Sequence, residues 1–291
     1  MNKRNKVIFF LCRAYTAMTR FFLSHRIPIA NGIQQECFTI RSMQRILLFF
    51  ITIFITFSAL AQKKISPGQT GILKVSFINT VNGVPLVLND SVYSNPFGET
   101  YRISKLKYYI SNLRAKNTGI AQKERNSYHL LNAADTTSTG FGFSLKPGNY
   151  STLEFLLGVD SLRNCSGAQT GALDPMNDMF WTWNSGYVMF KLEGSSPASG
   201  QLNNRIEYHI GGYSGMNKVI KKVSLQSSFE IEAGKTTTLF IETDINKIWK
   251  GSNDISIART PVCATTGPLA RRIADNYSNM FSLKKVTVSK P

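Results

Sequence analysis

The sequence has few of the residues on which most enzyme active sites depend. It contains 3 histidines and 4 cysteines among 291 residues. It has no Gly-x-Ser-x-Gly elbow, no His-Glu-x-x-His, no glycine-rich phosphate loop and no Cys-x-x-Cys-His. Asp160 and Asp174 share an irregular segment and could form a carboxylate pair, but aspartates in such segments more often form turns. We therefore expect a protein that is not an enzyme.

Long apolar runs are lacking as well, except near the N-terminus. Met43-Gln44-Arg45 precedes an apolar run over 46–57, and Ala59 and Ala61 lie at the −3 and −1 positions of a cut before Gln62. A basic start, a short apolar core and a small-x-small exit predict a secretory signal peptide over 43–61. A membrane anchor is the alternative, but the run is shorter than the roughly 20 residues that a spanning helix needs.

These boundaries predict the organisation of the chain. Residues 1–42 have no clear period and precede the signal peptide, so we interpret them as a misassigned N-terminal extension. The mature protein is then one domain over 62–291, in the periplasm or at the cell surface, with no integral membrane segment after signal removal. Acidic residues are scarce, 17 against 34 basic ones, and the net charge of +17 falls to +10 without residues 1–61. The basic residues are dispersed and form no aromatic-interleaved stripe, so we expect no nucleic-acid partner.

Only two cysteines, Cys165 and Cys263, remain in the mature chain. In an oxidising compartment such a pair is typically a disulfide, which we predict here. A cysteine metal site is the alternative, and no Cys-x-x-Cys spacing supports it.

The mature chain alternates apolar and polar residues from Gly71 onward, with turn residues between the runs. Asn82-Gly83 between two such runs is a strong hairpin signal. The pattern predicts an all-β protein, a single antiparallel β-sandwich with a long irregular loop over about 158–186. One helix is expected late in the chain, opening at Pro268 and carrying apolar residues at helical spacing as far as Phe281.

The long loop carries an unusual cluster: Met176, Met179, Trp181, Trp183 and, at its end, Tyr187. Thioether sulfur is a soft ligand suited to Cu(I), and indole rings can shield such a site from water. The alternative is that these residues simply plug one end of the sandwich.

Three segments resemble the MbnP-like copper-binding family, and in particular its Bacteroidota-type branch. This family is related to the methanotroph proteins MopE and CorA. The segments are Phe-Trp-Thr-Trp-Asn-Ser-Gly-Tyr over 180–187, Gly-Val-Asp-Ser over 158–161, and Tyr-His-Ile-Gly-Gly over 208–212. The resemblance implies a β-rich exported protein that holds one copper ion. It also implies a tryptophan beside the metal that a partner di-heme, peroxidase-like enzyme oxidises to kynurenine.

Carried over by position, His209 matches the histidine of the family's His-x-Gly strand, and Trp181 or Trp183 would be the modified indole. Relatives often have a second histidine where this chain has Asn177. Copper would then recruit His129, or else the thioethers of Met176 and Met179, which would favour Cu(I). We predict the second set, His209 with Met176 and Met179.

A different class of function uses the same aromatic cluster. Trp181, Trp183 and Tyr187 could stack on a ligand in a carbohydrate-binding or surface-interaction module without metal.

Overall fold

The computed structural model describes residues 70–290, apart from 168 and 183–185. The N-terminal extension, the signal peptide and Trp183 lie outside the described residues, so what the sequence predicts for them stays a prediction. Within the described part, no helix has the length and apolar character needed to cross a membrane.

Strands make up most of the described chain, and two α-helices and six 3-10 turns connect them. The strands are β1 (Gly71–Val81), β2 (Val84–Pro85), β3 (Tyr93–Ser94), β4 (Thr100–Asn117), β5 (Ile120–Lys123), β6 (Tyr128–Asn132), β7 (Gly140–Leu145), β8 (Gly148–Leu157), β9 (Phe180–Thr182), β10 (Gly186–Ser195), β11 (Arg205–Gly211), β12 (Lys221–Ile231), β13 (Thr236–Asp244), β14 (Val262–Cys263) and β15 (Phe281–Ser289). The helices are α3 (Ser161–Asn164) and α4 (Pro268–Tyr277), and the 3-10 turns are η1 (Thr136–Thr139), η2 (Gly171–Leu173), η3 (Pro175–Asn177), η4 (Leu202–Asn204), η5 (Gly215–Asn217) and η6 (Ile245–Ile248).

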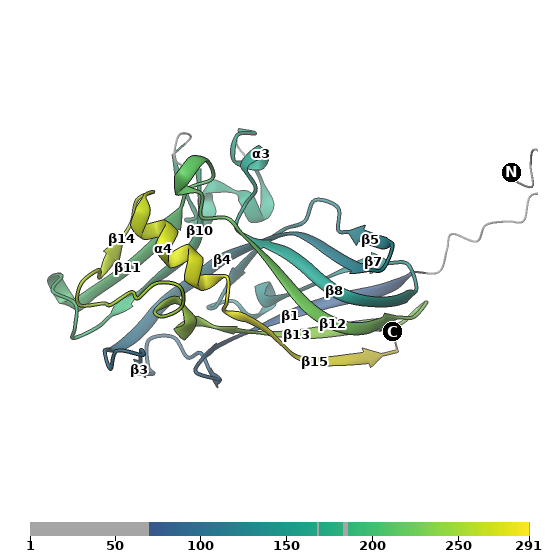
Figure 1. The fold of residues 1–291 in the computed structure, drawn as a ribbon, viewed down its shortest axis with the longest axis horizontal. Coiled ribbons are helices and arrows are strands. Elements are labelled where there is room, and N and C mark those ends of the chain that lie inside the picture. The colour runs from purple at the N-terminus through teal and green to yellow at the C-terminus, as the bar shows by residue number, and fades with distance from the viewer. Residues whose placement is uncertain (1–69, 168, 183–185, 291) are drawn as a thin grey trace, which may run out of the picture. The chain divides into compact units, whose positions relative to one another are not determined.

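The strands form two sheets (Figure 1). The first has the order β15-β13-β1-β2, with β7 also paired to β1, and the second has the order β12-β8-β4-β10-β11-β14. The prediction of an all-β, sandwich-like fold is confirmed. The expectation of purely antiparallel sheets is wrong in two places, because β1 pairs with β13 and β11 with β14 in parallel.

The core lies between the two sheets and follows from the alternation in the strands. Leu73, Val75 and Phe77 of β1 are buried, and the residues between them are more exposed. The Phe77 ring contacts Phe155 of β8 at 5.8 Å and Phe281 of β15 at 6.1 Å between centroids. Burying each such side chain contributes about 1.5–3 kcal/mol, so these rings help to hold the sheets together.

The late helix is present but shorter than the sequence predicts. α4 begins at Pro268 after Gly267 and ends at Tyr277, and Phe281 starts strand β15 instead of ending the helix. Phe281 is buried against Phe155 at 5.1 Å. Its hydrophobicity therefore serves the inter-sheet core, and its helical spacing from Tyr277 is coincidental.

The segment from Gly158 to Thr182 packs on the second sheet. The Tyr109 hydroxyl of β4 donates to the Ala172 carbonyl at 3.0 Å, and the Tyr187 hydroxyl of β10 donates to the Leu173 carbonyl at 2.7 Å. These bonds join two strands to the middle of the predicted loop, which contains α3, η2, η3 and β9. The loop is thus anchored on the sheet face where the candidate site lies.

Candidate functional site

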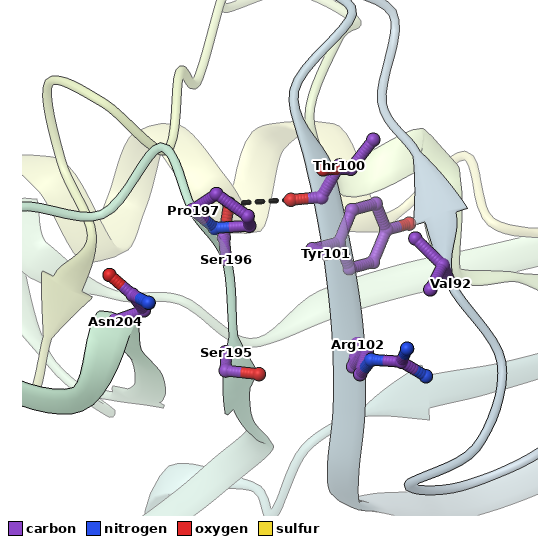
Figure 2. A pocket seen from close by; sticks show the side chains of 8 residues that line it. All are labelled: Val92, Thr100, Tyr101, Arg102, Ser195, Ser196, Pro197 and Asn204. Atoms are coloured by element: carbon purple, nitrogen blue, oxygen red, sulfur yellow. Dashed lines mark hydrogen bonds between the residues drawn. The ribbon is translucent and has the colours of Figure 1, made fainter.

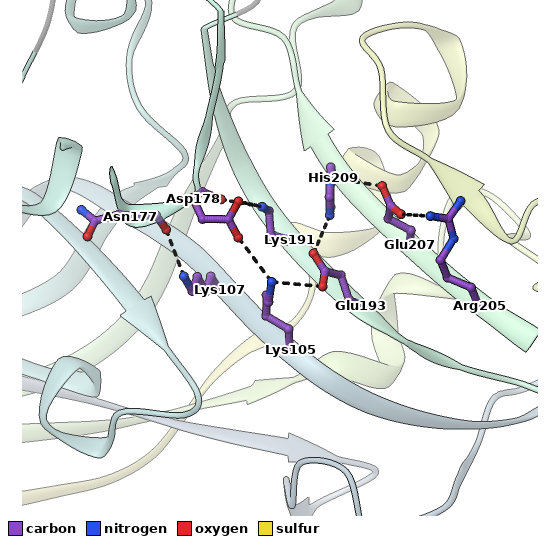
Figure 3. A network of polar contacts seen from close by, with 9 residues as sticks. All are labelled: Lys105, Lys107, Asn177, Asp178, Lys191, Glu193, Arg205, Glu207 and His209. Carbon is purple, nitrogen blue, oxygen red and sulfur yellow. Dashed lines mark hydrogen bonds and ion pairs between the residues drawn. The ribbon is translucent and has the colours of Figure 1, made fainter. Parts of the chain in front are cut away.

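Charged side chains line one face of β4, β10 and β11. Lys191 of β10 is opposite Lys107 of β4 and His209 of β11. Opposite residues share a face and successive residues alternate, so every second side chain joins this face. Its members, which we call the polar face, are Lys105, Lys107, Lys191, Glu193, Arg205, Glu207 and His209 (Figure 3).

His209 lies on the polar face with both ring nitrogens directed at carboxylates (Figure 3). Its Nε2 is 2.9 Å from Oε1 of Glu193, and its Nδ1 is 3.5 Å from Oε1 of Glu207. Partial burial alone would raise the pKa of Glu193, but His209 and Lys105 outweigh it and hold that pKa below its usual value. Glu193 is therefore an ionised acceptor beside the imidazole at neutral pH.

The Trp181 side chain comes from β9 and packs against Gly211 of β11, on the same face as His209. A Cβ added at Gly211 would stand 2.5 Å from Cζ3 and 3.0 Å from Cη2 of the Trp181 indole. Gly211 follows His209 by two residues, so their side-chain positions are roughly 7 Å apart on one face. The glycine of the His-x-Gly pattern admits the indole, and the structure brings Trp181 close to His209.

The two methionines do not point into a common site with His209. Met176 is 89% exposed, whereas Met179 is fully buried in the core cluster. The chain between them passes through Asp178, which has φ 61°, and this left-handed residue redirects the backbone after η3. A thioether site that uses both sulfurs would require this segment to rearrange.

Asn177, which stands where relatives often have a histidine, is used within the loop. Its side-chain amide donates to the Gly171 carbonyl at 2.8 Å and to the Ala172 carbonyl at 3.1 Å. The next residue, Asp178, directs its carboxylate at Lys191 and Lys105 of the polar face (Figure 3). The side chains of Asn177 and Asp178 are thus directed at partners other than His209.

His129 lies on the other face of the same sheet. Its cross-strand partner in β4 is Ile110. Ile110 points away from the polar face, because side chains alternate along β4 and Lys107 belongs to the polar face. The His129 ring stacks on Phe141 of the first sheet, with centroids 3.5 Å apart and planes 1° apart, and its Nε2 is 2.9 Å from Glu124. The structure therefore does not bring His129 and His209 together.

The Tyr187 ring is not open for stacking on a ligand. Tyr187 is 1% exposed, and its ring contacts Tyr109 at 5.7 Å and Phe180 at 4.9 Å. Burial raises the pKa of Tyr187, which keeps the hydroxyl protonated as a hydrogen-bond donor. Burial thus removes Tyr187 from the carbohydrate-binding alternative, whereas Trp181 is only partly buried and Trp183 lies outside the described residues.

Cys165 and Cys263 are free thiols, so the predicted disulfide is not formed in this structure. Cys165 is exposed beside the Tyr213 side chain. Cys263 is buried on β14, where it is the cross-strand neighbour of Tyr208 in β11. Burial raises the pKa of Cys263 to about 11, which makes it an unreactive thiol.

Two cavities within the described part of the chain are lined by none of the predicted metal ligands. A cavity of about 220 Å³ lies beside the paired ends of β4 and β10 (Figure 2). Its lining residues are Val92, Thr100, Tyr101, Arg102, Ser195, Ser196, Pro197 and Asn204. The Ser196 hydroxyl donates to the Thr100 carbonyl at 2.6 Å, and the Arg102 guanidinium donates to the Asp90 carbonyl. These polar groups bond to the chain itself.

Asp160 and Asp174 act as caps and not as a carboxylate pair. Asp160 lies at the wall of a cavity of about 440 Å³ and accepts hydrogen bonds from the Tyr128 hydroxyl at 2.5 Å and the Arg163 backbone at 3.1 Å. Asp174 accepts from the Met176 backbone at 2.9 Å. Each carboxylate satisfies the first turn of a short helix.

The polar face supplies too few ligands to surround a metal ion completely. Among the described residues, no group of three or more His, Cys, Asp or Glu side chains is placed to hold a metal ion. His209 and Glu193 form a donor pair 2.9 Å apart. Two ligands at right angles on one first-row metal, each about 2.0–2.2 Å from it, are about 2.8–3.1 Å apart. In this structure, however, the 2.9 Å contact is a hydrogen bond, so the imidazole and the carboxylate would have to reorient before both could bind one metal ion.

Sequence reasoning missed Glu193 and the lysines of the polar face. The signal was present as period-two charge in the strands, Lys191-x-Glu193 and Arg205-x-Glu207-x-His209. The sequence gives each strand's alternation but not which strands are neighbours. Only the register of β10 against β11 places Glu193 within reach of His209.

Comparison with known proteins decides the family. The MbnP family model matches residues 70–265, which include the whole candidate site. The chain belongs to the MbnP family. A search of curated proteins finds no match.

Among solved structures, MbnP from Methylosinus trichosporium is similar to this MbnP-family chain. The two are 13% identical with a TM-score of 0.44, and the match covers 64% of this chain and 80% of that one. At this level the likeness carries no argument about the site. What the MbnP-family site does is therefore argued from its own residues.

Proposed function

We propose that this MbnP-family chain is an exported, non-catalytic, copper-associated protein that holds the metal at His209 and Glu193, beside Trp181. The observation that carries the proposal is the 2.9 Å pairing of the His209 Nε2 with a Glu193 carboxylate, on the strand face where Trp181 lies against Gly211. The family's association with copper supports the choice of metal. Its compartment is the periplasm or the cell surface.

The donor types favour Cu(II) over Cu(I). Imidazole nitrogen and carboxylate oxygen are ligands of intermediate and hard character, whereas Cu(I) prefers sulfur. Met176 and Met179 lie in different surroundings, so the thioether set expected from the sequence is not assembled. The Lys105 ammonium is 3.1 Å from Glu193, and Lys191 is the cross-strand neighbour of His209, so their charge would weaken binding of a cation.

Trp181 is the described indole that this arrangement favours for oxidation to kynurenine. It lies one side-chain position from His209, so a metal at His209 would be its neighbour. The oxidant would come from a partner, a di-heme enzyme of the peroxidase-like class. Copper, when bound, would supply a redox-active centre next to this indole.

Copper titration of the exported protein tests the proposal. Cu(II) should bind in competition with a weak chelator at one ion per chain, and His209→Ala should abolish binding. His129→Ala is the matched control, because His129 makes the same 2.9 Å contact with a glutamate on the opposite face. Equal loss in both variants, or no copper bound by the wild type, would overturn the copper site.

Mass spectrometry of protein from the native host tests the indole separately. The Trp181 peptide should lose one carbon and gain one oxygen, and recombinant protein made without the partner should lack the change. An unmodified Trp181 in native protein would refute this part of the proposal and leave the copper titration standing.

A further inference from the structure

Asp178 holds the segment before Trp181 onto the polar face. Its Oδ1 is 3.0 Å from the Lys191 ammonium, and its Oδ2 is 3.3 Å from the Lys105 ammonium. The residue ends η3 in the left-handed region, at φ 61°. That conformation is uncommon for a residue other than glycine, although Asp and Asn tolerate it, and here it turns the carboxylate toward the two lysines.

Lys191 is the buried half of this contact. The residue is 4% exposed, and its ammonium contacts Asp178 at both the carboxylate and the backbone carbonyl. Removing the partner of a buried charge strongly destabilises a protein, because the charge that remains is uncompensated. Lys191 therefore binds Asp178 more firmly than an exposed lysine would.

A third lysine holds the residue before Asp178. The Lys107 ammonium donates to the Asn177 carbonyl at 2.9 Å (Figure 3). The loop is thus attached to β4 and β10 through consecutive residues, immediately before β9. Trp181 follows Asp178 by three residues, and the Met179 carbonyl between them accepts from the Val188 backbone at 2.9 Å.

We propose that Asp178, with Lys191 and Lys105, is a latch that positions the Trp181 indole over Gly211, beside His209. Asp178 and Lys191 are positioning residues, which act on the indole through the ion pairs that hold the loop on the strands. The proposal rests on the proposed function only in taking Trp181 as the functional indole. The position of the indole in copper-free protein is a property of the chain alone.

Lys105 of the latch also contacts Glu193, one of the proposed metal ligands. The Lys105 ammonium is 3.1 Å from Oε2 of Glu193, whose other oxygen contacts His209. When Asp178 is neutral, Lys105 is left to Glu193 alone and holds it more firmly. Loss of the latch should therefore weaken copper binding as well as release Trp181.

Fluorine NMR of copper-free protein labelled with 5-fluorotryptophan tests the latch. The chain has 3 tryptophans, so Trp181→Phe assigns the resonance of interest, and fully buried Trp249 reports on the integrity of the fold. Asp178→Asn removes the charge and preserves a residue that accepts the left-handed conformation. Lys191→Met removes the buried ammonium, and Lys284→Met is the control, because Lys284 pairs with Glu242 at 2.8 Å on the other sheet.

In Asp178→Asn and Lys191→Met, the Trp181 resonance should shift and its broadening by a soluble nitroxide should increase several-fold. The Trp249 resonance should stay in place, and Lys284→Met should match the wild type. An unchanged Trp181 resonance in Asp178→Asn with Trp249 in place would overturn the latch, even if Lys191→Met fails to fold. Because no copper is present, this outcome is independent of whether the proposed metal site exists.

Discussion

His209 and His129 make the same hydrogen bond in two different surroundings. Each imidazole Nε2 lies 2.9 Å from a glutamate oxygen, of Glu193 in one case and Glu124 in the other. His129 is stacked on Phe141 toward the inter-sheet side, whereas His209 lies on the polar face near Trp181. A histidine–glutamate pair is therefore not a metal site by itself, and the groups around it decide what it can do.

The difference follows from strand alternation. A side chain on one face of the second sheet meets the first sheet, and one on the other face meets the loop that carries Trp181. On the inner face the imidazole contributes packing. On the polar face it has carboxylates on both nitrogens and an indole nearby, which is where chemistry can occur.

Filling the space under Trp181 should break this comparison most strongly. Gly211→Ala places a methyl group 2.5 Å from the indole and 3.1 Å from the Tyr187 carbonyl, so the indole must move. We expect the free energy of unfolding to fall by about 1–3 kcal/mol, measured by denaturant titration, together with loss of Trp181 oxidation in the native host. Gly200→Ala is the control, since an added Cβ there meets nothing within 4 Å. Equal stability of the two variants would contradict the placement of the indole.

Neutralising each glutamate in turn should sharpen the comparison. Glu193→Gln should weaken Cu(II) binding by at least about 10–100-fold, because that range holds for groups that only support a ligand and Glu193 is a proposed ligand. Glu124→Gln should leave the dissociation constant unchanged, because its histidine faces the core. Competition with a chelator measures both, and similar losses in the two variants would remove the distinction between the faces.

His129→Ala should affect folding and leave copper alone. The stacked pair of His129 and Phe141 contributes about 0.5–1.5 kcal/mol beyond the area it buries, and this should be lost from the free energy of unfolding. Copper stoichiometry should be that of the wild type. A drop in stoichiometry without a drop in stability would reverse the roles assigned to the two histidines.

Local patterns predicted the elements of the fold better than their pairing. The Asn82-Gly83 hairpin is confirmed, with φ of 53° and 79° at the two residues, because a two-residue turn is specified by its own side chains. The parallel pairing of β1 with β13 was missed, because its strands are far apart in sequence and alternation alone does not specify direction.

The site could be predicted only where a motif is contiguous. His209 and Trp181 come from two recognisable segments, and the structure brings them close through Gly211. Met176 and Met179 are neighbours in sequence, but the left-handed turn at Asp178 separates their environments. The roles of Lys191 and Asp178 depend on how a loop lies on a sheet, which spacing along the chain does not report.

The smallest expected effect concerns pH and compares the latch with the core. Partial burial would raise the pKa of Asp178, but Lys191 and Lys105 outweigh it, so the folded pKa lies below the usual value of about 3.9. A carboxyl with a depressed folded pKa stabilises the fold above its unfolded pKa and loses that effect as pH falls through the folded value. The Trp181 fluorine resonance should therefore be constant from neutral pH to about pH 5 and shift only below about pH 4. Asp178→Asn should show no such step, and a Trp249 resonance that moves at the same pH would instead indicate global acid unfolding.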